Sequence, residues 1–482
     1  MAIIMMSNPF TTTSPVASTH TSPFSRHDTV ASIRRIFNAR SIAVVGASGD
    51  PAKFGYMTLD CLVGGGYDGA IFPVNPKGGH ILDLKVYPSV SDIPGRLDLV
   101  LIIVPFQFVA GVLEEATQKG AAGAVICSGG FREAGRPDLE EQLSMIGRKT
   151  GIRLLGPNIS GIAYLPNKMC AQFFPALTQA GPLAVVCQSG TVTTGLCEWA
   201  TDEGIGVAAG INLGNQVDLC ECDYLDFFAQ DKNIRSIVMY LEGVSNGRRF
   251  LDTLSRTTAC KPVVIYKGGR TEAGQRSTLS HTGSMASSHE VFSAACRQAG
   301  ALVAENIETA YDYAKALAHM RPLKGNRLFC ISTSGGANTL AMDGIESWGL
   351  VAPPLPAKVI DKLKSLGLSP LAGFTNPMDL VSIQAEDFLK AVLEIDRHDV
   401  ADGVLLNFGD PVVGELEMVQ KIDHQIKASI AISYFAGGSQ EKIGRPALSR
   451  AGFPVFAAPD RAIRGFGAQW WRTNYLHQRG LG

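Results

Sequence analysis

The sequence has little net charge and no long hydrophobic run. Its 482 residues carry a net charge of −1, which argues against nonspecific binding to nucleic acid or to an anionic membrane surface. The longest apolar stretch, Leu97 to Phe106, contains Asp98 and has about half the length that a membrane-spanning helix needs. These two absences predict a soluble protein, and we expect it in the cytoplasm.

The sequence also lacks the cysteine spacings of metal sites and disulfide frameworks. None of its ten cysteines forms a C-x-x-C pair, and Cys220 and Cys222 are closer together than the usual zinc ligands. Most of the cysteines lie within apolar runs or helical patterns. They are typical of small core residues in a reducing compartment, and we expect no metal ligands among them.

The first 30 residues lack the pattern of a folded segment. They are rich in Ser, Thr and Pro and contain no acidic residue before Asp28. This composition favours a disordered tail. An organelle transit peptide is the less favoured interpretation, because Arg26 is the only Lys or Arg before Arg34.

The rest of the chain alternates short apolar segments of strand length with segments of helix length. Such alternation predicts parallel, doubly wound α/β sheets, and the length predicts about three domains. Strands are expected at 41–45, 70–74, 97–104, 123–127 and 153–155, then at 182–187, 206–211, 236–241 and 262–266, and finally at 327–331, 402–406, 428–433 and 454–457. We therefore predict a tail over 1–30 and three consecutive domains over 31–160, 161–322 and 323–482.

The first glycine turn, Gly46-Ala47-Ser48, follows the first strand but does not complete a G-x-G-x-x-G motif. The second strand leads into Asn75-Pro76-Lys77, where an NAD enzyme usually offers Asp or Glu to the ribose. A lysine there disfavours NAD and suits a ligand with a further phosphate, such as NADP or coenzyme A. A structural turn without a ligand stays an alternative. Two further loops at strand ends are Val104-Pro105 and Ser128-Gly129.

The second predicted domain places polar residues at two strand ends. Gln188-Ser189-Gly190 lies between a strand and a helix, so it either binds an anion at the helix N-terminus or caps that helix through Ser189. Glu242 follows the strand at 236–241. Its carboxylate could accept the proton of an imidazole and leave the other ring nitrogen as a nucleophile, or it could be a solvated turn residue.

One histidine stands in a run of small residues, Ser280-His281-Thr282-Gly283-Ser284. A neutral imidazole is a nucleophile near pH 7, and small neighbours allow a phosphate to approach it closely. The alternative is a loop histidine that only hydrogen-bonds its neighbours.

Together, these motifs give the chain a family resemblance. The S-H-T-G-S segment, Gln188-Ser189-Gly190 and Tyr240-Leu241-Glu242-Gly243-Val244 resemble the α subunit of NDP-forming acyl-CoA synthetases, which include the ADP-forming acetate–CoA ligases of the succinyl-CoA synthetase superfamily. The resemblance covers about residues 31 to 465. It also includes Gly46-Ala47-Ser48, Asn75-Pro76-Lys77, Gly156-Pro157-Asn158 and Asn376-Pro377-Met378-Asp379.

The resemblance implies a Rossmann-like CoA-binding domain followed by two flavodoxin-like domains. His281 would carry a phosphoryl group from ATP to a carboxylic acid, and Glu242 would orient it. Gln188, Ser189, Gly190, Thr282 and Gly283 would bind the phosphate. Coenzyme A would bind at Gly46, Ala47, Ser48, Asn75, Lys77, Val104, Pro105, Ser128 and Gly129.

The resemblance also implies partners. Too few residues follow the third domain to hold an ATP-grasp module, so we expect a separate ATP-grasp β subunit, an α2β2-like assembly, ATP and ADP with Mg²⁺, and a small carboxylic acid. Two alternatives are a CoA-dependent acyl- or carbamoyl-transferring relative and a non-catalytic CoA-binding regulatory protein. His281 argues against the first, and His281 and Glu242 together argue against the second.

Overall fold

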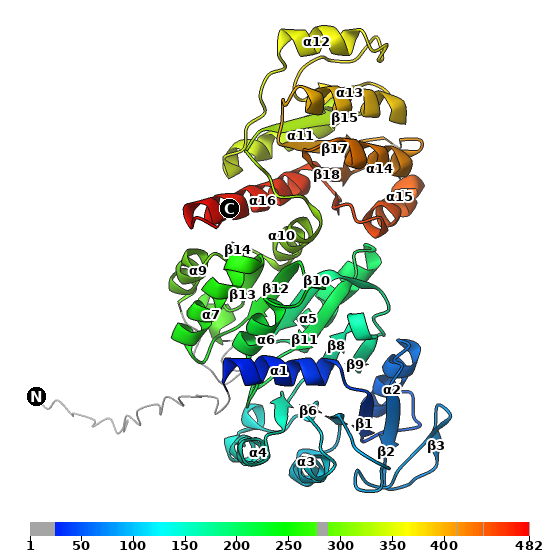
Figure 1. The fold of residues 1–482 in the computed structure, drawn as a ribbon, viewed down its shortest axis with the longest axis vertical. Coiled ribbons are helices and arrows are strands. Elements are labelled where there is room, and N and C mark those ends of the chain that lie inside the picture. The colour runs from blue at the N-terminus through cyan, green and yellow to red at the C-terminus, as the bar shows by residue number, and fades with distance from the viewer. Residues whose placement is uncertain (1–24, 277–287, 411, 437, 482) are drawn as a thin grey trace, which may run out of the picture.

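The protein consists of three twisted sheets stacked along its long axis, each covered by helices (Figure 1). The computed structural model describes residues 25–276, 288–410, 412–436 and 438–481. The first 24 residues, the greater part of the predicted tail, lie outside this range. No helix of the described residues is long and apolar enough to cross a membrane.

The first sheet has the order β2-β1-β5-β6-β7, and all its neighbours are parallel. The chain leaves β1 towards β2 on one side and then returns to add β5 on the other, so the strand order reverses between β1 and β5. The strands are β1 Ser41–Val45, β2 Ala70–Val74, β5 Leu99–Ile102, β6 Gly123–Ile126 and β7 Arg153–Leu155; the helices are α2 Phe54–Gly64, α3 Val109–Gln118 and α4 Pro137–Thr150. A two-stranded hairpin of β3 His80–Ile81 and β4 Leu84–Lys85 lies beside it.

The second sheet has the order β14-β13-β12-β10-β11-β8-β9. Its parallel strands are β10 Ala180–Cys187, β11 Val207–Asn212, β12 Ser236–Leu241, β13 Val263–Lys267 and β14 Leu302–Ala304, and its helices are α5 Gly190–Asp202, α6 Glu221–Phe228, α7 Gly247–Cys260, α9 His289–Gln298 and α10 Ile307–His319. The antiparallel hairpin of β8 Gly161–Tyr164 and β9 Met169–Gln172 was not expected from the sequence. Both strands are buried along their whole length, so they show no alternation of polar and apolar residues.

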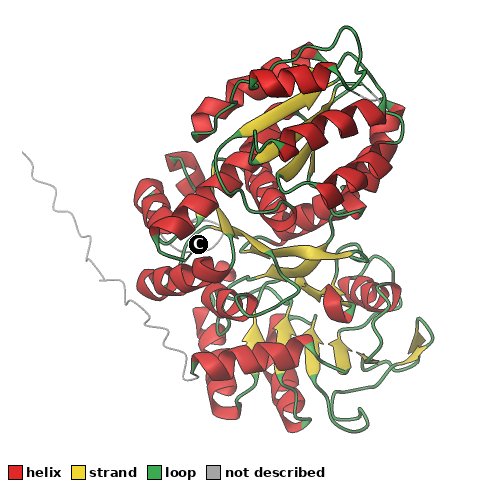
Figure 2. Cartoon of the chain, turned by 45° about the horizontal axis from the view of Figure 1, so that its top comes forward, coloured by secondary structure: helices red, strands yellow, loops and turns green. Residues whose placement is uncertain are grey.

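The third sheet has the order β16-β15-β17-β18-β19, again parallel, and helices cover both of its faces (Figure 2). Its elements are β15 Leu328–Ser332, α11 Gly335–Ile345, α12 Ala357–Lys364, β16 Met378–Asp379, α13 Ala385–Arg397, β17 Gly403–Phe408, α14 Glu415–Gln425, β18 Ser429–Tyr434, α15 Ser439–Arg450, β19 Val455–Phe456 and α16 Pro459–Gln478. The three parallel, doubly wound units confirm the predicted fold class. The predicted boundaries fall between β7 and β8 and between α10 and β15, and they stay a prediction.

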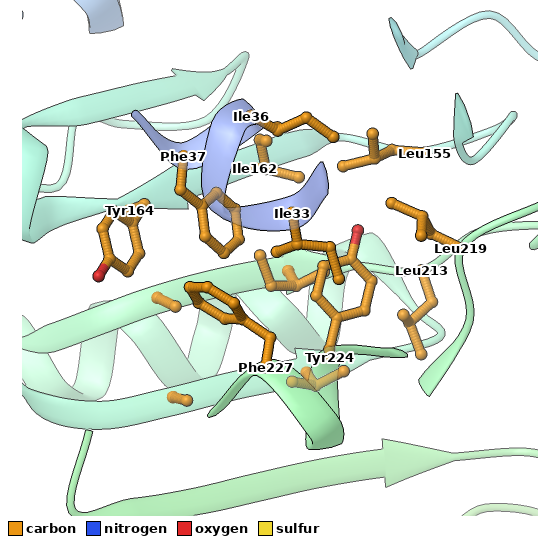
Figure 3. Packing of buried hydrophobic residues seen from close by; sticks show 14 of the residues in the cluster. Ile33, Ile36, Phe37, Leu155, Ile162, Tyr164, Leu213, Leu219, Tyr224 and Phe227 are labelled. Atoms are coloured by element: carbon orange, nitrogen blue, oxygen red, sulfur yellow. The ribbon is translucent and has the colours of Figure 1, made fainter. Parts of the chain in front are cut away.

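The N-terminal helix α1, Arg26–Phe37, joins the first and second sheets through an apolar core. It begins at Arg26, inside the predicted tail of residues 1–30, because Ser25 caps it by accepting the N–H of Asp28. The ring of Phe37 stacks on Tyr164 at 4.6 Å and meets Phe227 edge-on at 5.2 Å (Figure 3). One core cluster therefore contains residues of both sheets.

The second and third sheets meet through apolar packing and, in addition, through buried charged side chains. Lys315 on α10 is fully buried and donates to Glu203 Oε2 at 2.9 Å and to the carbonyl of Val455 at 2.8 Å. Arg461 on α16 forms a bidentate ion pair with Asp312 on α10. Since each charge is paired or hydrogen-bonded, this junction can be buried at a tolerable cost.

Candidate functional site

Two loops that carry predicted site residues, one with Gln188 and one with Glu242, meet at the carboxyl edge of the second sheet. Strands β10 and β12 are parallel neighbours, with Cys187 opposite Tyr240. The two residues that follow these strands, Gln188 and Glu242, are therefore adjacent. Ligands of open α/β sheets bind at this edge, beyond the carboxyl ends of the strands.

Gln188 fastens the two loops together. Its Oε1 accepts the N–H of Glu242 and, at 3.1 Å, the N–H of Gly243. Its Nε2 donates to the carbonyl of Gly243 at 2.8 Å, and its own N–H donates to the carbonyl of Tyr240. Gln188 thus binds the backbone of the neighbouring strand end with both ends of its amide.

The N-terminus of α5 follows directly. Ser189 caps the helix, with its Oγ 3.5 Å from the N–H of Val192. A Cβ at Gly190 would lie 3.3 Å from both Asn212 Oδ1 and Ser160 Oγ, so this turn packs closely against the end of β11. The positive end of the helix dipole and its first backbone N–H groups suit an anion at this position, in addition to the cap.

Glu242 is buried, with 5% of its surface exposed, which contradicts the alternative of a solvated turn residue. Its Oε1 accepts a hydrogen bond of 3.1 Å from the hydroxyl of Tyr240. Burial and the negative charge of Glu242 raise the pKa of Tyr240 above its usual value, so the phenol stays a neutral donor. Gly268 makes the room, since a Cβ there would lie 2.7 Å from the Tyr240 oxygen.

Sequence reasoning missed Tyr240, although one signal was available. In a strand, residues two apart share a face, and Tyr240 and Glu242 are so spaced. A carboxylate and a phenol on one face at a strand end are within reach of each other.

His281, Thr282 and Gly283 lie outside the described residues. The chain leaves the second sheet at the end of β13, the neighbour of β12, and returns to it with α9. The structure therefore positions Glu242 and the N-terminus of α5, while the pairing of Glu242 with His281 stays a prediction.

The nine residues predicted to bind coenzyme A all follow the carboxyl ends of β1, β2, β5 and β6 in the first sheet. Gly46 has a φ of +94°, and a Cβ there would lie 2.1 Å from the carbonyl oxygen of Ile103. The N–H groups of Gly46 and Ala47 both donate to the carbonyl of Val74. This glycine is therefore required by the turn itself, and the turn lies where the strand order reverses.

Side chains connect these four strand ends in two pairs, β1 with β2 and β5 with β6. Asn75 Nδ2 donates to the carbonyl of Ala47 at 2.8 Å, and Asn75 Oδ1 accepts the N–H of Lys77 at 3.0 Å. The hydroxyl of Ser128 donates to the carbonyl of Val104 and lies 3.3 Å from its N–H. Ser48 Oγ accepts the N–H of Asp50 within its own loop. Pro105 and Gly129 complete the nine residues predicted to bind coenzyme A.

The loop from Gly214 to Asp218 links the first-sheet loops to those of the second. Asn215 Nδ2 donates to Glu133 Oε2 at 2.6 Å and to Glu140 Oε1 at 2.7 Å, and Glu133 in turn accepts the N–H of Gly130. Its neighbour Gln216 lies 3.4 Å from Gln188. The two sites are therefore joined by a continuous set of polar contacts.

Comparison with known proteins assigns both domains to known families. The family model of a CoA binding domain matches residues 40–164, and that of a succinyl-CoA ligase like flavodoxin domain matches residues 180–317. The α subunit of ADP-forming acetate–CoA ligase I from Pyrococcus furiosus is 36% identical over 466 residues, which are 93% of this chain and 99% of that protein. The chain belongs to the family of ADP-forming acyl-CoA ligases.

Other relatives extend this assignment. The solved acetyl-coenzyme A synthetase 1 of Candidatus Korarchaeum cryptofilum, in complex with phosphate and ADP, has a TM-score of 0.84 and 32% identity over 93% of this chain and 98% of that one. The ADP-forming 4-hydroxybutyrate–CoA ligase of Nitrosopumilus maritimus is 30% identical over 89% of this chain and 62% of that protein. The predicted resemblance, the Rossmann-like and flavodoxin-like folds and the ligase function are thereby confirmed, in preference to the transferase and regulatory alternatives.

Proposed function

We propose that this chain is the α subunit of an ADP-forming acyl-CoA ligase that works through a phosphohistidine at His281. The observation that carries the proposal is the joined pair of loops at the second sheet, where the buried carboxylate of Glu242 lies close to the N-terminus of α5. A phosphohistidine needs both features: a carboxylate that orients the imidazole and balances its charge, and N–H donors for the phosphoryl oxygens.

The proposed reaction has three transfers. A ring nitrogen of His281 attacks the γ-phosphorus of ATP, so that an N–P bond forms, a P–O bond breaks and ADP leaves. A carboxylate oxygen of the acid then takes the phosphoryl group and frees the histidine. The sulfur of coenzyme A, bound at the first sheet, attacks the acyl carbon, and inorganic phosphate leaves. The steps are reversible, and Mg²⁺ would accompany the nucleotide.

The proposal includes partners. ATP would bind to an ATP-grasp β subunit, in an α2β2-like complex. The acid would be a small carboxylic acid; the relatives named above act on acetate in one case and on 4-hydroxybutyrate in another.

Transfer of label from γ-labelled ATP tests the phosphohistidine. The chain is incubated with its β partner, and acid-labile, base-stable label is measured on the α chain. His281→Asn should abolish the label. The matched control is His289→Asn, because His289 is the next histidine in the sequence and lies half-buried on α9. An unlabelled wild type, or label that persists in His281→Asn, would refute the proposal.

Calorimetric titration of the full chain with coenzyme A tests the first-sheet site. Lys77→Ala should weaken binding by about tenfold, through loss of one charge contact to phosphate. Lys85→Ala, on the adjacent hairpin, is the control and should bind like the wild type. Equal affinity of all three proteins for coenzyme A would show that Lys77 does not contribute to the coenzyme A site.

A further inference from the structure

A buried ammonium group lies directly behind the Glu242 loop. Lys267 is the last residue of β13 and has no exposed surface. Its Nζ donates to the carbonyl of Glu242 at 2.7 Å and to that of Gly268 at 2.6 Å, and lies 5.7 Å from the centre of the Phe292 ring. In the part of the chain that the structure describes, no carboxylate forms an ion pair with Lys267.

Such a position is unfavourable for a cation. Two carbonyl dipoles and an aromatic face replace only part of the hydration of an ammonium group, and buried charges are normally paired. Burial accordingly lowers the pKa of Lys267, although the negative charge of Glu242 opposes this. A side chain without charge would fill the same space at lower cost, so stability alone does not account for a lysine here.

The connections of Lys267 lead towards the helix N-terminus. The carbonyl of Glu242 accepts from Lys267, while the N–H of the same residue donates to Gln188. Gln188 immediately precedes Ser189, which caps α5. Only the Glu242 residue and the Gln188 side chain therefore stand between the ammonium and the loop that opens α5.

We infer that Lys267 is a positioning residue of the ligase: it holds the Glu242 strand end in place and supplies the positive charge that offsets a phosphoryl group at the N-terminus of α5. This inference rests on the proposed function for the place of the phosphoryl group. It explains why a cation that has no ion pair among the described residues is kept in a buried position, since the substrate adds negative charge to that of Glu242.

The chain offers a matched control at the other end of the same strand. Lys261, just before β13, also donates to two carbonyls, those of Asp231 and Ile234, and burial also lowers its pKa. It lies at the amino edge of the sheet, away from Gln188 and Glu242. A lysine that only joins two carbonyls should behave like Lys261.

The experiment compares Lys267→Met and Lys261→Met in the complex with the β partner. Lys267→Met should slow the labelling of the α chain by γ-labelled ATP by about a hundredfold, the usual effect of removing one preorganised electrostatic group. Its affinity for coenzyme A should not change. Lys261→Met should label at the wild-type rate and lower only the melting temperature.

Two further variants separate charge from hydrogen bonding. Lys267→Arg keeps a cation and should restore part of the labelling rate, whereas Lys267→Gln keeps a neutral donor and should not. If Gln restores the rate as well as Arg does, or if Lys267→Met labels like Lys261→Met, Lys267 is a structural residue and the inference is wrong.

Binding of inorganic phosphate to the full chain, followed by phosphorus NMR, gives a readout that does not require His281 to react. Lys267→Met should raise the dissociation constant for phosphate at least about tenfold, and Lys261→Met should leave it unchanged. If wild type is unlabelled by ATP, the proposed function fails, and the phosphate affinity alone then tests the inferred role of Lys267. Unchanged phosphate affinity in Lys267→Met would then overturn the inference.

Discussion

The second and third sheets build the same local structure from different residues. In the second sheet, Gln188 follows the strand β10 and accepts the N–H groups of Glu242 and Gly243. In the third, Thr333 follows β15, and its hydroxyl accepts the N–H groups of Gly409 and Asp410 at 3.0 and 2.9 Å. Each side chain thus hydrogen-bonds the loop before its own helix to the backbone at the end of the neighbouring strand.

The two units differ in the hydrogen bonds made by side chains at equivalent positions next to these loops. Tyr240 in the second sheet corresponds to Asn407 in the third, because each lies opposite the last residue of its neighbouring strand. Tyr240 donates to Glu242, whereas neither polar atom of Asn407 has a hydrogen-bond partner among the described residues. Lys267 corresponds to Tyr434, whose buried hydroxyl also lacks a partner there.

The comparison shows which part of the site belongs to the fold and which part is specific. The backbone arrangement recurs in both units, so it is a property of the strand–loop–helix connection. At the positions of Glu242 and Lys267, the third unit has Gly409 and Tyr434. We therefore expect the specificity of the second unit to reside in side chains such as Glu242, Tyr240 and Lys267, in addition to the proposed phosphohistidine, and not in the glycine turn.

The largest expected effect is that of Glu242→Gln. A neutral amide cannot balance the charge of an imidazolium, so the rate of phosphoenzyme formation should fall by about a thousandfold. Asp379→Asn, at the end of β16 in the third sheet, is the control for loss of a carboxylate at a strand end. Equal slowing of labelling by the two substitutions would contradict the claim that the phosphoryl site lies at the second sheet.

The junction between the two units should weaken in acid. Burial lowers the pKa of His319 on α10 to about 4, and its Nδ1 lies 3.1 Å from the carbonyl of Gly452. The unfolded chain binds this proton near pH 6.5 and the folded chain does not, so stability falls as the pH drops from about 6.5 to about 4, by about 3 kcal/mol. Urea unfolding across this range should show a smaller loss in His319→Gln than in wild type. An equal loss in both proteins would assign the acid sensitivity to other groups.

Removal of either fastening side chain should cost stability. Gln188→Leu and Thr333→Val each leave two backbone N–H groups without their acceptor, which lowers the free energy of unfolding by about 1–3 kcal/mol. Only Gln188→Leu releases Glu242, so it should slow phosphoenzyme formation more strongly than Thr333→Val. The reverse order of the two rates would contradict the comparison.

The smallest effects are expected at Tyr240 and Asn407: substitution of Tyr240 should lower activity, whereas substitution of Asn407 should raise stability. Tyr240→Phe removes one hydrogen bond to a carboxylate and should lower kcat by about tenfold while the melting temperature changes little. Asn407→Leu replaces a buried amide without partners by an apolar side chain of similar size and should raise the free energy of unfolding by about 1 kcal/mol. Destabilisation by Asn407→Leu would show that its amide is satisfied.

Much of the fold could be predicted because buried parallel strands are short apolar runs bounded by turns. β1, β2, β7 and β12 begin and end at the expected residues. The hairpin β8–β9 could not be distinguished, since its strands are buried on both faces and Gly161, with a φ of +116°, interrupts the pattern. Helix α6 was not predicted either, and it is buried along its whole length despite its acidic residues.

The candidate site divides in the same way. Glu242 and Ser189 could be selected because strand ends and helix starts are visible in the sequence. Gln188 was selected too, but as a phosphate ligand; its contacts with the Glu242 loop and those of Lys267 depend on the register of β10, β12 and β13, which no single segment reveals. The residues that hold a site are therefore harder to predict than those that perform its chemistry.

The most direct test of the central claim is to locate the phosphoryl group on the α chain. After reaction with ATP and the β partner, trypsin releases the peptide of residues 277–297, which contains two histidines, His281 and His289. The peptide is kept in alkaline solution, which preserves phosphohistidine, and its fragmentation by tandem mass spectrometry shows which of the two histidines carries the phosphate. We predict phosphate on His281 alone, at a level that Glu242→Gln greatly reduces. Phosphate on His289, on another peptide, or at an unchanged level in Glu242→Gln would contradict the assignment of this edge of the second sheet as the phosphoryl site.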